Sequence, residues 1–396
     1  MPDLLTVLTN LSWPIAIALA WLAGEFGQRL TGLPRISFYG LVGFALASSQ
    51  LGALPPADAG PVLALADVSF GLILFELGYR INARWFLTNP WLLASALVES
   101  LGTFVAVYFT ANAFGTSTLT SLMLASLAMS SSPATVIRIV NEMRSSGQVT
   151  ERVLHLSAVN CLLAVFAFNV ILGFWIFHTA NDIGAAAIDT LVRLLLSLTL
   201  GAIFGVVVPA LLRQLGNLAR DATVAFAIAV MLLVSICYSS GLSSVAATLA
   251  FGLMARHRRV AFSQAQRNFG ALGELLTVLL FVYAASTLDW RKVAAGASLA
   301  LAVVGVRMLA KTIGVTAFAR LSGITWRKGA LTGLALTPVS VFVILLLEHA
   351  RQRGVDVLDE LRAMAAVTML LEVFGPIIIQ RALLWARESK GSQHAS

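Results

Sequence analysis

Two short stretches of the sequence combine hydroxyl side chains with a proline inside long apolar runs. Ser131, Ser132 and Pro133 lie in one run, and Thr337 and Pro338 lie in another. Proline removes a backbone donor and clashes with the preceding turn, so each run is expected to break there. A break frees backbone polar groups, which can bind a small ion together with neighbouring hydroxyls. The two stretches are therefore candidates for a functional site.

A third polar stretch follows the first proline along the chain. Ser157, Asn160 and Cys161 share one helix face by the i, i+3, i+4 rule. Such residues either line a site or hold two helices together by hydrogen bonds. Cys161 is a thiol in apolar surroundings, so it is expected to stay protonated. Because the stripe follows a broken segment, we interpret it as part of the same site.

Ionisable residues inside apolar runs are the remaining candidates. A charged side chain at the middle of a span costs about 2.5–3.5 kcal/mol on insertion scales, so it usually has a role. Arg307 and Lys311 lie one turn apart on one helix face, and Glu372 lies in the last run. They are interpreted as a charged core that is either functional or structural. Glu99, in the middle of its run, can also carry a proton if burial favours the neutral form.

The composition indicates that these residues lie in a membrane protein. Of the 396 residues, 58% are hydrophobic and 12% are charged, whereas soluble domains carry about 45–50% and about 25%. A water-soluble enzyme and a nucleic-acid-binding module are therefore poor interpretations. Two cysteines form neither a disulfide framework nor a four-ligand zinc site. No nucleotide or metalloprotease motif occurs, so we expect neither enzymatic activity nor a cofactor.

Apolar runs separated by short polar breaks are expected to be transmembrane helices. There are thirteen, at 12–30, 34–52, 61–79, 90–111, 117–140, 152–177, 187–212, 222–240, 243–256, 269–287, 293–319, 328–349 and 363–386. The predicted fold is an all-α polytopic membrane protein with about 13 spans. Residues 387–396 are expected to be a short polar tail without fixed structure.

Basic residues are distributed unequally between alternate loops. One side collects nineteen of them, and the other side has six, Arg193, Arg291, Lys292, Arg351, Arg353 and Arg362. Lys and Arg concentrate on the cytoplasmic side of membrane proteins. We therefore expect a plasma-membrane protein with its N-terminus outside and its C-terminus in the cytoplasm. The net charge of +8 is then a topology signal and needs no nucleic acid.

The prolines indicate an internal repeat. Pro133 lies in the fifth run and Pro338 in the twelfth, seven helices later. Because seven is odd, the second unit is inverted relative to the first. An inverted repeat with broken helices in matching positions is typical of transporter sites, although two ordinary proline kinks would give the same pattern. The sequence thus predicts an inverted repeat with two broken helices.

Several stretches resemble the monovalent cation:proton antiporter family, which has a sodium/proton exchanger-like membrane domain. They are LILFELGYR at 72–80, SPATVIR at 132–138, GQVTER at 147–152, SGLSS at 240–244 and TMLLEVFGP at 368–376. The likeness extends in the same order over about residues 12–386.

The resemblance implies a single membrane domain over residues 1–386, built from a dimerisation scaffold and a mobile core. Transport would be an elevator movement of the core within a homodimer in the lipid bilayer. The implied parts are a scaffold at about 1–82 and 215–290, a core at about 88–180 and 293–386, and a linker helix at about 186–214.

The resemblance also implies an ion site on the sixth helix, beside the crossing of the broken helices. The family has an Asn-Asp or Asp-Asp pair there, whose aspartate binds a cation or a proton. The matching pair here is Asn160 and Cys161, so this position lacks a carboxylate. A neutral thiol is a poor ligand for Na⁺ or K⁺, which prefer oxygen. Lys311 matches the family's basic position on the eleventh helix and would face Asn160.

Three functions remain open. The first is an atypical Na⁺ or K⁺:proton antiporter whose proton is carried elsewhere, for example by Lys311 or Glu372. The second is an anion transporter, since the positive ends of broken helices with Arg307 and Lys311 favour anions. The third is a membrane sensor that kept the fold without transport. No metal site is expected beyond a transported Na⁺ or K⁺.

Overall fold

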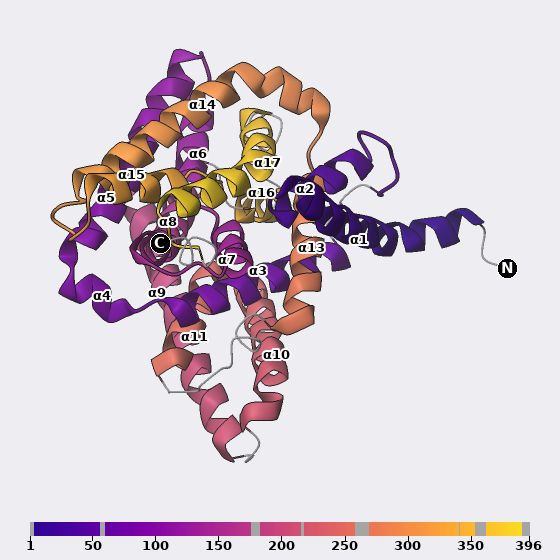
Figure 1. The fold of residues 1–396 in the computed structure, drawn as a ribbon, viewed down its shortest axis with the longest axis horizontal. Helices are drawn as coiled ribbons and strands as arrows, with labels where there is room; N and C mark the ends of the chain where they lie inside the picture. The colour runs from indigo at the N-terminus through magenta and orange to yellow at the C-terminus, as the bar shows by residue number, and fades with distance from the viewer. Residues whose placement is uncertain are drawn as a thin grey trace.

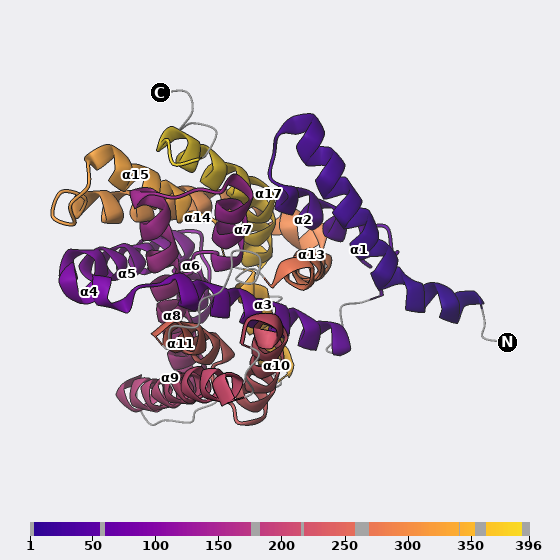
Figure 2. The ribbon, with the colours of Figure 1, turned by 60° about the horizontal axis from the view of Figure 1, so that its bottom comes forward.

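The computed structural model describes residues 4–55, 60–175, 183–214, 218–257, 269–339, 341–352 and 362–389. Every regular element within these ranges is an α-helix, which confirms the all-α prediction (Figures 1 and 2). The helices are α1 (Leu4–Thr31), α2 (Arg35–Leu46), α3 (Pro61–Arg80), α4 (Ala83–Thr88), α5 (Pro90–Ala113), α6 (Thr118–Ala128), α7 (Pro133–Met143), α8 (Gln148–Trp175), α9 (Ile183–Gln214), α10 (Leu218–Ser239), α11 (Ser244–His257), α13 (Gly270–Ser286), α14 (Trp290–Ala317), α15 (Trp326–Ala335), α16 (Phe342–Gln352) and α17 (Arg362–Trp385).

Many of these segments are long and apolar enough to cross a membrane. Among the described residues there are eight, Pro61–Arg80, Pro90–Ala113, Thr118–Met143, Gln148–Phe174, Ile183–Gln214, Ala222–Ser239, Trp290–Ala317 and Ala366–Trp385. Two shorter apolar helices accompany them, Arg35–Leu46 and Ala271–Ser286. The chain is therefore a multi-pass membrane protein, and the count of thirteen spans stays a prediction.

Helix α9 shows how small residues pack these helices. Its large side chains, such as Leu195, are exposed, whereas Ser197, Gly201 and Gly205 are buried. In a membrane an outer face of large apolar residues is solvated by lipid, and small residues let helix backbones approach closely. A Cβ atom on Gly201 would overlap the carbonyl oxygen of Ala247 in α11. The GxxxG pair, a weak signal by itself, thus packs α9 directly on α11.

A second pair of glycines joins α11 to α3. A Cβ atom on Gly252 would overlap the Phe75 carbonyl, and one on Gly78 would overlap the Leu249 carbonyl. Helix α11 is therefore held between α3 and α9, and α10 packs against all three. Figure 1 shows α9, α10 and α11 together at the bottom of the view. The predicted division into scaffold and core stays a prediction.

Both predicted breaks are confirmed. Helix α6 ends before Pro133, which begins α7, and the segment between α15 and α16 contains Thr337 and Pro338. Pro133 lies in the first turn of α7, where backbone N–H groups have no partner within the helix, so the lack of an N–H costs no hydrogen bond. The side chain of Ser132 caps the same helix by accepting a hydrogen bond from the Thr135 amide at 3.3 Å.

The two breaks lie against each other. The Ser132 amide donates to the Pro338 carbonyl at 3.0 Å. The Ser131 hydroxyl donates to the Leu336 carbonyl at 2.9 Å. Segments that are about 200 residues apart in the sequence thus satisfy each other's freed backbone groups, as the crossing of the broken helices requires.

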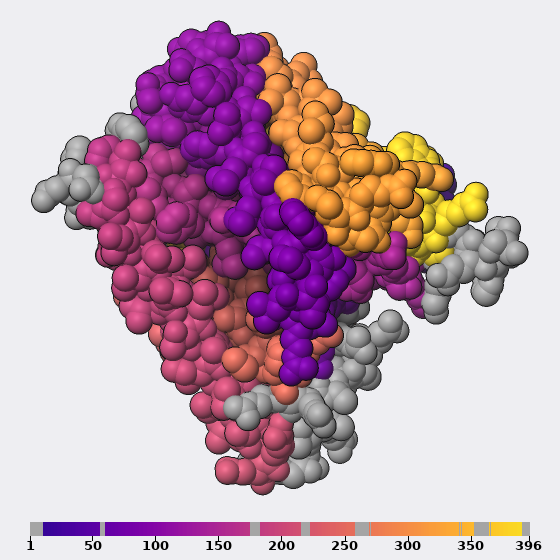
Figure 3. All heavy atoms as spheres, turned by 90° about the vertical axis from the view of Figure 1, so that its left-hand side faces the viewer, coloured from indigo at the N-terminus to yellow at the C-terminus, as the bar shows by residue number. Residues whose placement is uncertain are grey.

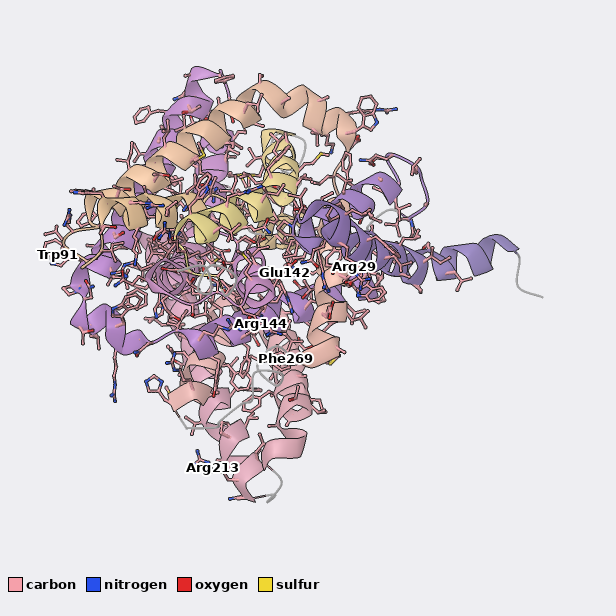
Figure 4. The ribbon with its side chains drawn as sticks, viewed as in Figure 1. Arg29, Trp91, Glu142, Arg144, Arg213 and Phe269 are labelled. Atoms are coloured by element: carbon pink, nitrogen blue, oxygen red, sulfur yellow. The ribbon has the colours of Figure 1, made fainter. Side chains whose placement is uncertain are left out.

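The long helices α5 and α14, one element before each broken helix, also pack together. Helix α5 runs along α14, and Figure 3 shows α4 and α5 in purple beside α14 and α15 in orange on one face. On another part of the molecule the C-terminal ends of α1 and α7 meet, where Gln28 donates to Glu142 (Figure 4, near the labelled Arg29). The predicted topology places both ends on the cytoplasmic side, so this contact agrees with it.

The start of the C-terminal tail is part of the folded structure. Glu388 is buried, and its carboxylate accepts hydrogen bonds at 2.8 Å from the amides of Val149 and Thr150 and from the Thr150 hydroxyl. An anion is stabilised by the free N–H groups of a helix N-terminus, here that of α8. The expectation of an unstructured tail is therefore wrong for Glu388 and Ser389, and residues 390–396 lie outside the described residues.

Candidate functional site

Arg307 of α14 holds the end of the first broken helix. Its Nε donates to the Ala128 carbonyl at 2.7 Å, and its Nη2 donates to the Ser130 carbonyl. Nη2 also lies 3.4 Å from the Pro338 carbonyl in the second break. The last carbonyls of a helix carry partial negative charge, so they compensate a fully buried guanidinium. Arg307 thus ties both breaks to α14.

Lys311 lies one turn further along α14 and is fully buried. Its Nζ donates to the Met129 carbonyl at 3.0 Å and lies 2.9 Å from Oε2 of Glu99. Neither side chain of this ion pair is exposed. A buried pair of opposite charges is sustainable only when further hydrogen bonds satisfy both groups. Both groups here have such bonds, since Glu99 is also bonded to Asn160.

Glu99 of α5 reaches the crossing of the broken helices. Its Oε1 accepts from the Asn160 amide, and the same amide nitrogen donates to the Ser131 hydroxyl at 2.9 Å. The Asn160 carbonyl oxygen accepts from Ser100 at 2.8 Å. Gly314 permits this approach of α5 and α14, because a Cβ atom there would lie 2.6 Å from the Glu99 Cβ. The site therefore contains a carboxylate, although position 161 does not supply it.

Cys161 also lies at the crossing. Its thiol is fully buried and donates to the Ser131 carbonyl at 3.2 Å. Ser157, one turn earlier on α8, donates to the Leu154 carbonyl of its own helix at 2.9 Å. Thr337 is buried beside Pro338, and its hydroxyl has no hydrogen-bond partner among the described residues.

The structure brings together most of the residues that the sequence analysis selected. Hydrogen bonds at the two breaks link Ser131, Ser132, Asn160, Cys161, Arg307, Lys311 and Pro338. Pro133 and Thr337 lie in the same two breaks, next to Ser132 and Pro338 in the chain. Glu372 does not join them. Among the described ion pairs none connects Glu372 to Lys311 or Arg307, and its side chain lies against Gly40 of α2. Helix α17 reaches the second break with Gly375, which packs on Pro338.

Glu99 is the site residue that sequence reasoning recognised only as a general proton carrier. A pattern on α5 could have assigned it to the site. Ser95, Glu99, Ser100 and Thr103 recur at helical spacing and are all buried. A polar face on an otherwise apolar helix marks the side that contacts protein instead of lipid.

An open cavity of about 220 Å³ lies beside α8 on the side of its C-terminal end. Its lining extends along α8 from Gly173 to Val165, one turn from Cys161. Its charged and titratable lining residues are Asp67, Asp189, Arg193 and His349, and Arg193 is paired with Asp189 at 2.9 Å. His349 Nε2 lies 3.0 Å from the Asp67 carboxylate. The cavity is therefore a polar approach to the helix that carries Asn160.

The chain is similar to known proteins in sequence and in fold. Residues 15–385 match the family described as "Sodium/hydrogen exchanger, transmembrane". One solved structure of the sodium proton antiporter MjNhaP1 from Methanocaldococcus jannaschii, at pH 8, has a TM-score of 0.67 at 16% identity, covering 94% of this chain and 95% of that chain. An electron-microscopy structure of MjNhaP1 has a TM-score of 0.70 at 17% identity, covering 99% of this chain and 96% of that chain. No curated protein matches the chain by sequence.

The family match covers most of the chain. The protein therefore belongs to the sodium/hydrogen exchanger family of membrane transport proteins. Its fold is that of the MjNhaP1 structures. The resemblance stated from sequence motifs is confirmed, and the members of this class are antiporters.

Proposed function

We propose that the protein exchanges Na⁺ or K⁺ for protons, with Glu99 as the carboxylate that binds the cation. Family membership supports cation:proton exchange in general. The observation that carries the proposal is the position of Glu99, bonded to Asn160 and Lys311 at the crossing of the broken helices. A carboxylate is a hard oxygen ligand, which a thiol is not.

The oxygen atoms around Glu99 suit a small alkali cation. The Ser131 hydroxyl, the Asn160 amide oxygen and the freed carbonyl of Met129 lie in the same hydrogen-bonded cluster. In the present conformation the Glu99 carboxylate is paired with the Lys311 ammonium. An arriving cation has to displace it.

Displacement of Lys311 provides the coupling to protons. An ammonium group without its counter-ion is strongly disfavoured in a fully buried site, so it loses its proton when the cation binds. One cation then replaces one proton, and the charge of the Glu99–Lys311 pair with its ligand is unchanged. Return of a proton to Lys311 restores the ion pair and releases the cation.

The finer features of the transport cycle follow from the same proposal. The core would move as an elevator against a dimeric scaffold in the plasma membrane, with the N-terminus outside. Asp67 would offer a carboxylate to cations in the cavity beside α8, whereas Asp189 in the same lining is paired with Arg193 at 2.9 Å. This cavity would face outward in the predicted topology.

One observation favours an anion as the second candidate substrate. Arg307 Nη1 and the Thr337 hydroxyl are buried donors without a hydrogen-bond partner among the described residues. Donors of this kind can bind an anion at the crossing. The Glu99 carboxylate in the same cluster opposes it, so cation exchange is the better-supported function.

The test is exchange in liposomes. Purified protein is reconstituted with a pH gradient, and dequenching of a pH-sensitive dye is followed after separate additions of Na⁺, K⁺ and Cl⁻. We expect a response to Na⁺ or K⁺ that the Glu99→Gln variant lacks. The control variant is Glu25→Gln, at a partly exposed residue of α1, and it should keep the response. A response only to Cl⁻ would establish the anion transporter. Folded protein that responds to none would be a sensor, and a fully active Glu99→Gln variant would refute the role of Glu99.

A further inference from the structure

Glu372 is a buried carboxyl group that exchange at Glu99 does not use. It lies within α17, and only 7% of it is exposed. Among the described residues neither Oε1 nor Oε2 has a hydrogen-bond partner. An ionised carboxylate without a partner is strongly disfavoured in apolar surroundings and takes up a proton instead. In this conformation the side chain is therefore neutral.

The space around Glu372 admits a proton but no metal cation. The carboxyl group borders a cavity of about 10 Å³ between α17 and α2. A single water molecule needs about 10–15 Å³, and a cation needs several oxygen ligands. The lining is apolar and includes Leu41, Phe44, Leu288 and Met369. The proton is thus the only ligand that fits.

Among the described residues, no ion pair or hydrogen bond joins a charged side chain to the Glu372 carboxyl group. The helices α2, α7, α14 and α15 pack against α17, and α13 contributes to the cavity with its C-terminal end. Their ionisable groups are Arg35 and Tyr39 on α2, Arg138 and Glu142 on α7, Glu274 and Tyr283 on α13, Arg291, Lys292, Arg307 and Lys311 on α14, and Arg327 and Lys328 on α15. The bases have other partners, for example Glu274 for Arg35, the Gly273 carbonyl for Arg138 and the Trp385 carbonyl for Arg327.

The contact of α17 with α2 is close and local. A Cβ atom on Gly40 would lie 3.0 Å from the Glu372 Cγ, so the glycine of α2 and the glutamate side chain are in close contact. On the adjacent residue, the Val373 carbonyl accepts from the Ser37 hydroxyl at 2.9 Å. By the resemblance, α2 belongs to the scaffold and α17 to the mobile core. Glu372 therefore lies where these two parts meet.

We propose that Glu372 is a second proton-binding site, filled while α17 packs on α2 and emptied when the two helices separate and water reaches the carboxyl group. The proposal rests on the proposed antiport for its role in the cycle. An ionised Glu372 cannot re-enter the apolar contact, so the core returns to this conformation only after the proton has bound. Movement of the core then depends on protons independently of Glu99.

Chemical labelling tests the site without requiring transport. Dicyclohexylcarbodiimide is an apolar reagent that couples to protonated carboxyl groups. We expect mass spectrometry of the folded wild-type protein at neutral pH to find the label on Glu372. Glu76 is the matched control, because it is buried but paired with Arg80 at 2.8 Å, and it should stay unlabelled. Folded protein without label at Glu372 would overturn the proposal.

Exchange as a function of pH tests the role in the cycle. The glutamine side chain in Glu372→Gln is always neutral. The exchange rate of this variant should therefore be retained at high pH, where the exchange rate of the wild type falls. The ratio of variant to wild-type rate should grow with pH, by at most about tenfold per pH unit, the limit for one proton. Coincident pH profiles would overturn the proposal. Labelled Glu372 together with a fully active Glu99→Gln variant would refute the exchange at Glu99 and leave the second site standing.

Discussion

In a Glu99→Gln variant the Lys311 ammonium keeps the Met129 carbonyl at 3.0 Å but loses the carboxylate at 2.9 Å. Both side chains are fully buried, so water cannot take the place of the lost partner. Removing one member of a buried pair costs about 3–5 kcal/mol. Lys311→Met should cost a similar amount, because it leaves the Glu99 carboxylate with the Asn160 amide alone.

The double variant Glu99→Gln/Lys311→Met contains no uncompensated charge. Replacing a buried ion pair by neutral groups is often neutral, or stabilising by about 1–4 kcal/mol. With an unfolding entropy of about 2.1 cal/mol/K per residue, a loss of about 3–5 kcal/mol in a chain of 396 residues lowers Tm by about 4–6 °C. The double variant should therefore melt near the wild type, and each single variant about 4–6 °C below it.

Thermal unfolding of detergent-purified protein, followed by tryptophan fluorescence, measures these shifts. The matched control is Asp189→Asn with Arg193→Met, an i,i+4 pair whose side chains are more than half exposed. Pairs of that kind contribute about 0–1 kcal/mol, so neither control should shift Tm measurably. If the losses of Glu99→Gln and Lys311→Met add in the double variant, the two groups do not neutralise each other and the reasoning fails.

Three further predictions concern the same helices. Arg307→Lys should abolish exchange and lower Tm, because the donors of an ammonium group lie on one nitrogen and cannot reach all the carbonyls that the spread guanidinium nitrogens reach in two segments. Arg291→Lys in the exposed first turn of α14 should change neither. Cys161→Ser should retain most of the liposome exchange rate, and Cys161→Asp should strengthen Na⁺- or K⁺-dependent proton movement; loss of exchange in the serine variant would mean that the thiol titrates in the cycle. Glu388→Gln weakens three hydrogen bonds to α8, each worth about 1.5–3 kcal/mol, so Tm should fall without a change of ion selectivity; altered selectivity would contradict a purely structural role.

The breaks of the helices were predictable because proline acts locally. Pro133 and Pro338 remove backbone donors wherever the chain folds, and both lie at the breaks in the structure. The partner of Lys311 was not predictable in the same way. Glu99 is 212 residues away, and the contact depends on Gly314 bringing α5 against α14. An acidic residue in the middle of an apolar run indicates that the side chain is buried, but it does not indicate which residue it contacts.

Two other expectations failed for related reasons. Glu372 is ionisable and buried like Lys311 and Arg307, yet its side chain lies against Gly40 of α2, while Gly375, three residues later, packs on Pro338. The polar composition after residue 386 suggests a free tail, but one carboxylate meets the unsatisfied amides at the start of α8. Composition averages over residues, whereas a single favourable contact fixes a chain end.

The location of the acid on α5 separates the charge balance of the site from the residue at position 161. Loss of Glu99 would leave Lys311 buried without a counter-ion, at a cost of about 3–5 kcal/mol out of a total stability of about 5–15 kcal/mol. An aspartate at position 161 would instead give the site two acids, one of which can stay neutral by binding a proton. Position 161 can therefore change its charge alone, whereas Glu99 and Lys311 have to change together.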